Sequence, residues 1–387
     1  MTRLKKSILF IHRWLGFISG LVVVIVSITG CIFCFQDEIQ DAIHSYRKVE
    51  ILQQPYLAPS VLKQKALKDD PKAVVNYIYY YGKDRPAAVL ASKGQEGLDY
   101  IYLNPYTGQV IHRENIQSNF FVVVEYIHLY LLLPPKIGSM VVGISVLIFL
   151  VLMATGIILW WPRRKSDRKR SFTIKWGSRW RRINYDLHNV LGFYATSIAI
   201  ILAITGLSIA FDWVNKGIYN AANFGRKYPD EKVEPKSDTL QQVKKGQPII
   251  DHALQIAQRQ SPEAEMFLIY DPTAKADAVG VTAYAQSLHY YKSDEYNFDK
   301  FSGKLLKRLP HSKKSAGLKM NAMNYDIHVG QIWGLPGKIL AFITSLICAS
   351  LPVTGFVVWL GKRKKPKKKV TIKDIAHRKT HARLATH

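Results

Sequence analysis

The chain has 387 residues, a mean hydropathy of −0.03 and a formal net charge of +26. A charge of this size is typical of nucleic-acid binders, but the basic residues are unevenly placed. Residues 1–13, 162–187 and 361–387 hold 25 of the 54 Lys and Arg and only three acids, whereas the remainder is nearly balanced. This clustering beside very apolar stretches favours a membrane protein that contacts lipid and argues against a nucleic-acid partner.

Residues 1–35 combine a basic N-terminus with a first apolar run, residues 8–35, that is long enough to cross a bilayer. Residues 28–31, ITGC, are similar to a lipoprotein cleavage box. The same ITG recurs at residues 204–206, deep in the chain, so we interpret the motif as part of a helix. Cys31 and Cys34 lie one helical turn apart, and we interpret them as packing residues, with a redox pair as the alternative.

The segment that begins at Ile11 is repeated, without a gap, from Leu187 onward. Nine of twenty-five aligned positions are identical, and they include the pair His12/His188. An ionisable residue inside an apolar span is a functional hypothesis by default. The repeat therefore predicts that the two histidines share one role at equivalent depths.

Residues 36–118 are polar and predict a small α+β domain. Short periodic stretches predict one helix, two strands and a hairpin, at residues 59–67, 74–81, 87–91 and 99–112 respectively. The hairpin turn is Asn104-Pro105-Tyr106-Thr107-Gly108, where proline sets a turn φ and glycine takes a position that other residues avoid.

Residues 119–161 contain an apolar stretch, 120–133, that Pro134-Pro135 separates from the second span at 137–161. Because proline breaks a helix, we expect the first stretch to be a short helix at the outer membrane surface. A basic loop follows at residues 162–183.

The second half repeats this order. The third span is 184–211, and residues 212–318 again predict a helix (249–259), two strands (266–270 and 278–286) and a hairpin (296–306) with its turn at 299–303. Residues 319–360 hold an interfacial segment and the fourth span, 337–360, before the basic tail 361–387. Ile127-His128 and Ile327-His328 precede the second and fourth spans, which each end in Thr-Gly-x-x-x-Trp.

This order predicts a tandem duplication: a membrane α-helical four-helix bundle with two α+β domains. Lys and Arg accumulate on the cytoplasmic side of membrane proteins. We therefore expect both termini and the 162–183 loop to be cytoplasmic, and both soluble domains to lie on the opposite side.

These features resemble the PepSY-associated transmembrane family. The family opens on a His-Arg-Trp-Leu-Gly-like motif, here residues 12–16, and its spans carry Thr-Gly and Trp ends. The hairpin turns are similar to those of PepSY domains, and the resemblance covers nearly the whole chain through short motifs. Similar members include ferric-siderophore reductases of the bacterial inner membrane that hold two b-type haems. The resemblance implies two periplasmic PepSY-like domains, and it points to His12, His188, His128 and His328 as haem ligands.

The residues lead to a similar site independently. A duplicated bundle places its halves around a pseudo-two-fold axis, so His12 faces His188 near the cytoplasmic side and His128 faces His328 near the periplasmic side. Two facing imidazoles supply both axial ligands of a haem iron. The alternatives are interfacial histidines and a quinone site at one pair, and a structural zinc lacks the Cys or carboxylate ligands it needs.

Four glycines extend this argument. Gly30 and Gly206 each lie eighteen residues beyond a histidine, or about 27 Å along a helix, which places them beside the opposite pair. Gly156 and Gly355 similarly approach the cytoplasmic pair. Such small residues admit either a flat macrocycle or a closely packed neighbouring helix.

The sequence therefore predicts an oxidoreductase that carries electrons across the membrane through two haem b groups. The expected acceptor is a periplasmic ferric siderophore or related ferric chelate, and the expected donor is a quinol or a cytoplasmic reductase. The alternatives are a non-enzymatic PepSY-domain protein with an assembly or regulatory role, and a repeat-symmetric transporter.

Overall fold

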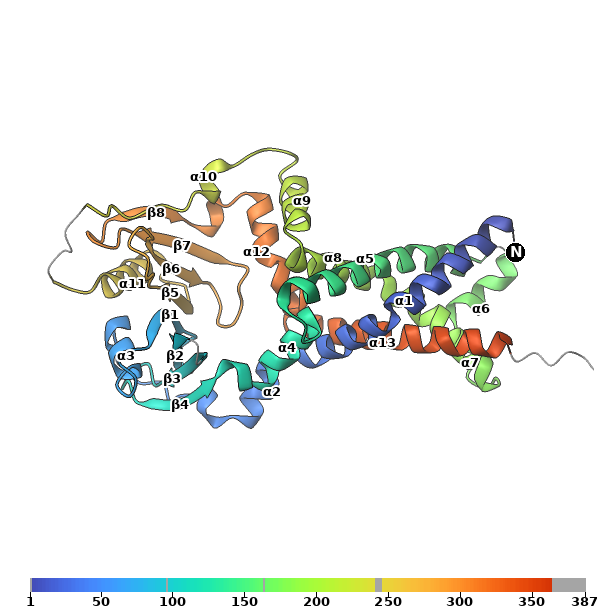
Figure 1. Cartoon of the computed structure of the whole chain (residues 1–387), viewed down its shortest axis with the longest axis horizontal. Helices are drawn as coiled ribbons and strands as arrows, with labels where there is room; N and C mark the ends of the chain where they lie inside the picture. Colours follow the sequence, from blue (N-terminus) through green and yellow to red (C-terminus); the bar gives the residue numbers. More distant parts are fainter. Residues whose placement is uncertain (1, 95–96, 163, 241–245, 364–387) are drawn as a thin grey trace, which may run out of the picture.

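The computed structural model describes residues 2–94, 97–162, 164–240 and 246–363. It is elongated, with a helical bundle at one end and a sheet covered by helices at the other (Figure 1). The N-terminus lies at the end of the bundle that is remote from the sheet (Figure 1).

Four helical runs of the described residues are long and apolar enough to cross a membrane. They are α1 (Arg3–Cys34), α5 (Pro135–Trp160), the run formed by α7 (Trp180–Asp186), η5 (Leu187–Leu191) and α8 (Gly192–Ala210), and the run formed by η7 (Gln331–Trp333) and α13 (Gly334–Arg363). The four predicted spans are therefore confirmed. The helices begin a few residues before the predicted apolar segments. α5 begins at Pro135, because proline suits the first helical turn, and α7 begins at Trp180, so that Arg181 and Arg182 precede the apolar segment within the same helix.

Two shorter helices stand at the end of the bundle nearer the sheet (Figure 1). Asn119 caps α4 (Phe120–Tyr130) by accepting hydrogen bonds from the N–H groups of Phe121 and Val122. Left-handed Leu131 and the following prolines end this helix, which confirms the predicted break before the second span. Ser315 caps α12 (Ala316–His328), a helix that the sequence analysis described only as an interfacial segment.

The polar segments contribute eight strands to one antiparallel sheet in the order β4-β3-β2-β1-β5-β6-β7-β8. Residues 36–118 supply β1 (Val74–Tyr80), β2 (Ala87–Ser92), β3 (Leu98–Leu103) and β4 (Val110–Asn115), and residues 212–318 supply β5 (Met266–Tyr270), β6 (Val279–Tyr284), β7 (Ser293–Phe298) and β8 (Leu305–Leu309). The segments meet at β1 and β5, where Tyr77 pairs with Tyr270 and Tyr80 with Phe267. Each predicted strand and hairpin is confirmed, and the sheet unites the two segments.

One face of this sheet is covered by α3 (Pro59–Ala66) and α11 (Ile249–Gln260), as Figure 1 shows. The core between them contains residues of both segments, among them Leu62, Ile78, Ile101, Ile269 and Val281. Both predicted hairpin turns are present, and Gly108 and Gly303 adopt φ angles of 71° and 70° that suit glycine.

The remaining short helices connect these parts. They are α2 (Gln36–Ile43), η1 (Ser45–Arg47), η3 (Ile116–Ser118), η4 (Lys165–Asp167), α6 (Arg168–Phe172), α9 (Asp212–Ala222), α10 (Pro229–Lys232) and η6 (His311–Lys313). Of these, α2 and α9 lie between the sheet and the bundle, as do α4 and α12 (Figure 1).

Candidate functional site

The structure brings the four candidate histidines together in two pairs. His12 on α1 and His188 on η5 have ring centroids 6.5 Å apart and planes at 87°. His128 on α4 and His328 on α12 have ring centroids 6.0 Å apart and planes at 67°. The pairing predicted from the repeat is confirmed, whereas the ligand role stays a prediction.

His188 lies in a single π-helical turn, Leu187–Leu191. Such turns are rare and often occur at functional sites. We call His12 and His188, at the end of the bundle remote from the sheet, the inner pair, and His128 and His328, at the end nearer the sheet, the outer pair. His12 lies in an uninterrupted α-helix, so the two members of the inner pair are held by different local structures.

The four candidate glycines each abut one histidine of the predicted pair. A Cβ atom added to Gly206 would lie 3.0 Å from Cε1 of His328, and one added to Gly30 would lie 3.2 Å from Cε1 of His128. At the inner pair, an added Cβ atom on Gly355 would lie 3.1 Å from Cε1 of His188, and one on Gly156 would lie 3.6 Å from Cε1 of His12. The predicted depths are confirmed, and the close contact of each glycine is with an imidazole ring.

Sequence analysis missed the threonine that precedes each of these glycines. In all four cases the Nδ1 atom of a histidine lies within hydrogen-bond distance of the threonine Oγ1: His12–Thr155 at 2.8 Å, His188–Thr354 at 3.0 Å, His128–Thr29 at 3.1 Å and His328–Thr205 at 2.9 Å. The signal was the Thr-Gly dipeptide, which occurs once in every span, and in α1 and α8 its glycine lies eighteen residues after a candidate histidine.

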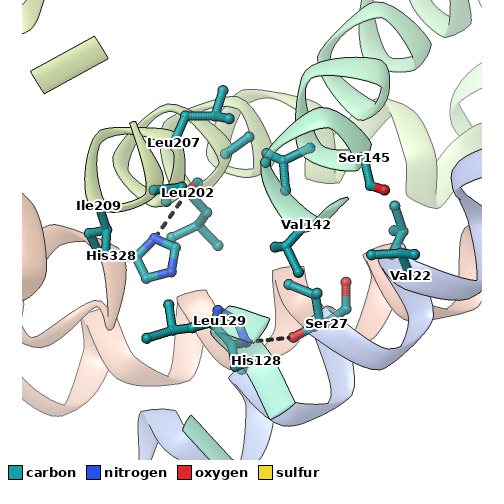
Figure 2. Close-up of a pocket in the computed structure, with 18 of the residues that line it drawn as sticks. Val22, Ser27, His128, Leu129, Val142, Ser145, Leu202, Leu207, Ile209 and His328 are labelled. Carbon is teal, nitrogen blue, oxygen red and sulfur yellow. Dashed lines mark hydrogen bonds between the residues drawn. The ribbon is translucent and has the colours of Figure 1, made fainter. Parts of the chain in front are cut away.

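The carbonyl contacts indicate the tautomer of the two histidines on α4 and α12. The Nδ1 atoms of His128 and His328 lie 2.9 Å and 3.0 Å from the carbonyl oxygens of Val26 and Leu202, which only accept (Figure 2). In these bonds the proton lies on Nδ1, and Nε2 keeps its lone pair. Each threonine hydroxyl also lies within hydrogen-bond distance of carbonyls of its own helix, for example Thr205 Oγ1 and Ile201 O at 2.9 Å, which leaves its oxygen able to accept from the imidazole.

A cavity of about 490 Å³ adjoins the outer pair. It is mostly apolar, with His128, His328, Glu125, Tyr325 and Lys136 among its polar lining residues. In Figure 2 both imidazoles project into this space, between α8 on one side and α1 on the other. Its volume lies in the range of cofactor and ligand sites.

The geometry fits a haem at each pair. Two imidazole rings lie together in each pair, with ring centroids 6.5 Å apart at one pair and 6.0 Å apart at the other. Each pair offers two histidines, and the described residues hold no group of three or more His, Cys, Asp or Glu placed for a metal ion. Two histidines would suit an iron whose remaining ligands come from a macrocycle, and the Nδ1 bonds are the support that metal-binding histidines need.

A family model described as the PepSY-associated TM region matches residues 9–362, which is nearly the whole chain. The chain belongs to this family. No curated protein matches it. Membership in the PepSY-associated family, together with the four apolar helices, identifies a multi-pass membrane protein with an α+β domain outside the bundle.

Other candidate residues of this PepSY-associated protein lie apart from the pairs. Cys31 and Cys34 are buried free thiols within α1, as packing residues are, and their redox role stays untested. His44 stacks on Tyr46, which in turn stacks on His112 at 3.9 Å. The tail histidines His377 and His381, and the tail beyond residue 363 in general, lie outside the described residues.

Proposed function

We propose that this protein carries electrons across the bacterial inner membrane through two b-type haems, one between each histidine pair, and reduces ferric siderophores or related ferric chelates outside. One observation carries the proposal. All four imidazoles, paired two by two, use Nδ1 for a contact with a threonine hydroxyl, and this leaves the Nε2 atom of each ring outside these contacts.

Each haem, when bound, supplies a one-electron carrier. The two histidines of each pair would hold it, and ligation of one iron by two imidazoles would suit electron transfer better than oxygen chemistry. The carbonyls of Val26 and Leu202 keep the proton on Nδ1 at the outer pair, and a threonine hydroxyl contacts Nδ1 of every ring. A neutral, hydrogen-bonded imidazole is the form that binds a metal best.

The depths of the two pairs support transfer across a membrane. On α1, His12 belongs to the inner pair and Gly30 abuts the outer pair. The eighteen residues between them rise about 27 Å, close to the thickness of a hydrocarbon core of about 30 Å. The two pairs thus stand near opposite faces of a bilayer.

The centre of the bundle supports electron transfer over solute transport. Val23, Phe149, Met153, Ala199 and Leu351 belong to one buried apolar cluster between the pairs, and Val23, Phe149 and Ala199 also line the cavity beside the outer pair. Apolar walls offer a polar solute few partners, whereas electron transfer needs none. This apolar lining is why we favour the reductase over the repeat-symmetric transporter.

The proposal includes an orientation. Both termini and the basic 162–183 loop face the cytoplasm with its anionic lipid, and the sheet faces the periplasm as two PepSY-like halves of a tandem duplication. Electrons enter from a quinol or a cytoplasmic reductase at His12 and His188, and they leave beside His128 and His328. Reduction aids release because oxygen-rich chelators hold iron(II) less tightly than iron(III).

Purified protein tests the proposal. We expect a low-spin haem spectrum with about two haems per chain, and we expect His188→Ala to lower the haem-to-protein ratio by about half. His44→Ala is the matched control, because His44 faces no second histidine and stacks on Tyr46. A colourless wild-type protein, or a protein in which His44 is needed for haem and His188 is not, would contradict the proposal.

Vesicles with the reductant confined to the cytoplasmic side test the direction. His328→Ala should still allow reduction of the inner haem while abolishing iron(II) release outside. Normal release by a His328→Ala protein that has lost its outer haem would remove the proposed exit.

A further inference from the structure

A pentapeptide of the form Asn-Tyr-Asp-Leu/Ile-His occurs twice, and each copy ends in a candidate ligand. Residues 184–188 read NYDLH and residues 324–328 read NYDIH. The other two histidines follow different residues, since residues 8–12 read ILFIH and residues 124–128 read VEYIH. Each pair therefore combines one histidine of the pentapeptide type with one that lacks it.

The asparagine of each pentapeptide binds the segment that also binds its histidine. Asn324 is 8% exposed, and its Nδ2 donates to the carbonyl oxygen of Thr205 at 3.1 Å. The same Thr205 accepts from His328 through Oγ1. Asn184, 3% exposed, donates likewise to Thr354 O at 3.0 Å, and Thr354 Oγ1 accepts from His188.

The spacing explains this two-point contact. Residues four apart lie on one face of a helix, so asparagine and histidine reach the same threonine from one side. Residues 8 and 124 are Ile and Val, whose side chains have no hydrogen-bond donor. His12 and His128 are therefore held without this second contact.

The aspartate of each pentapeptide binds a segment outside the spans. Asp326 is fully buried, and its Oδ2 accepts from the N–H groups of Tyr290 and Tyr291 at 3.0 and 2.8 Å. Gln331 Nε2 bridges Asp326 Oδ1, at 3.0 Å, and Leu288 O, at 2.6 Å. The loop between β6 and β7 is thereby fastened to α12.

The inner copy is built in the same way. Asp186 is 2% exposed and accepts from the N–H of Lys175 at 3.3 Å, in the basic loop that precedes α7. Arg182 pairs with the same carboxylate at 2.7 Å. A buried carboxylate is stable only when such donors surround it, so both aspartates depend on the segments they hold.

We propose that each pentapeptide is a clamp that ties one histidine pair to one segment outside the membrane, with Asn184, Asn324, Asp186 and Asp326 as positioning residues. The outer pair is tied to residues 288–291 and the inner pair to Lys175. A reaction partner that displaces either segment shifts the nearer pair alone. The inference rests on the proposed function only where it concerns the haem between the histidines. The clamp itself consists of hydrogen bonds between side chains and backbone.

Amide hydrogen exchange of the full-length protein tests the aspartates. Asp326→Leu should raise exchange at Tyr290 and Tyr291 by about tenfold, as expected for a lost hydrogen bond, and leave residues 173–178 unchanged. Asp186→Leu should do the reverse. Asp326→Asn keeps an acceptor oxygen and should restore part of the protection, and it also serves if the leucine variant does not fold. Equal exchange in wild type and Asp326→Leu, or exchange raised at both ends, would overturn the clamp.

Electron paramagnetic resonance tests the asparagines. Asn324→Leu should shift the low-spin signal of the outer haem and leave the inner signal in place, and Asn184→Leu should do the opposite. The control is Asn321→Leu on the same helix, because the side chain of Asn321 bonds to Asn215 and, among the described residues, to no histidine or threonine of the site. Signals unchanged in both leucine variants would refute a positioning role. Absence of haem from the wild type would refute the proposed function instead, and the exchange experiment would still decide the clamp.

Discussion

Replacing Gly206 with alanine adds a methyl group beside His328, and replacing Gly156 adds one beside His12. The new carbon would lie 3.0 Å from His328 Cε1 in the first case and 3.6 Å from His12 Cε1 in the second. A separation of 3.6 Å is an ordinary van der Waals contact, whereas at 3.0 Å the ring must move. His328 resists such a move because its Nδ1 is bonded to Thr205 and Leu202.

The two substitutions should therefore have opposite signs. Alanine in a helix is more stable than glycine by about 1 kcal/mol, while overpacking costs about 1–3 kcal/mol. Gly156→Ala should stabilise the protein by up to about 1 kcal/mol, because only the first term applies. Gly206→Ala should destabilise it by up to about 2 kcal/mol, because the second term prevails.

Thermal unfolding in detergent, read beside the haem-to-protein ratio, measures both effects. The midpoint should rise for Gly156→Ala and fall for Gly206→Ala, with haem lost only in the latter. Gly30→Ala and Gly355→Ala, at 3.2 and 3.1 Å from their rings, should resemble Gly206→Ala. Equal shifts in the same direction for Gly156→Ala and Gly206→Ala would show that contact with the imidazole does not decide the outcome.

Three further predictions concern other contacts. Thr205→Val removes the Oγ1 that contacts Nδ1 of His328 and should weaken haem retention by about 10- to 100-fold, measured by transfer to apomyoglobin. Thr196→Val should not, because the hydroxyl of Thr196 bonds to Gly192 O and to Met153 Sδ. Burial opposes ionisation of Asp41, but Arg85 and Arg47 outweigh burial and lower the pKa of this carboxyl. The stability that ionised Asp41 contributes is present above its unfolded-state pKa and should be lost as the pH falls through its folded-state pKa. Asp41→Asn should therefore flatten the dependence of unfolding free energy on pH in acid. An impermeant thiol reagent applied outside should label Lys275→Cys and not Arg168→Cys, and labelling of the latter would reverse the orientation.

Much of the site was predictable because its geometry follows from helix rise and from the repeat. The match between residues 11–35 and 187–211 paired His12 with His188, and eighteen residues of helix placed Gly30 beside His128. Apolar length and a double proline located the spans and α4. Each of these signals lies within a single helix or segment, so it can be read from the sequence without knowing how the helices pack.

What was missed depends on contacts between elements. A threonine in an apolar helix ordinarily bonds to its own backbone, and all four threonines do so. Only the facing imidazole gives each hydroxyl oxygen its second partner. Pairing of β1 with β5 was equally hidden, since an edge strand does not specify which neighbour completes it. The π-turn at His188 also has no local sequence signature.

The sheet has a consequence for the spacing of the outer histidines. Its two edge strands, β4 and β8, lead within a few residues into α4 and α12, which carry His128 and His328. The two histidine-bearing helices therefore start from opposite edges of one sheet, and the width of the sheet sets how far apart they begin. The inner histidines lie on α1 and η5, which no sheet among the described residues connects, and their separation depends on the packing of the spans and on the contacts of Asp186. A force that separates β1 from β5 would increase the distance between His128 and His328 and leave the distance between His12 and His188 unchanged.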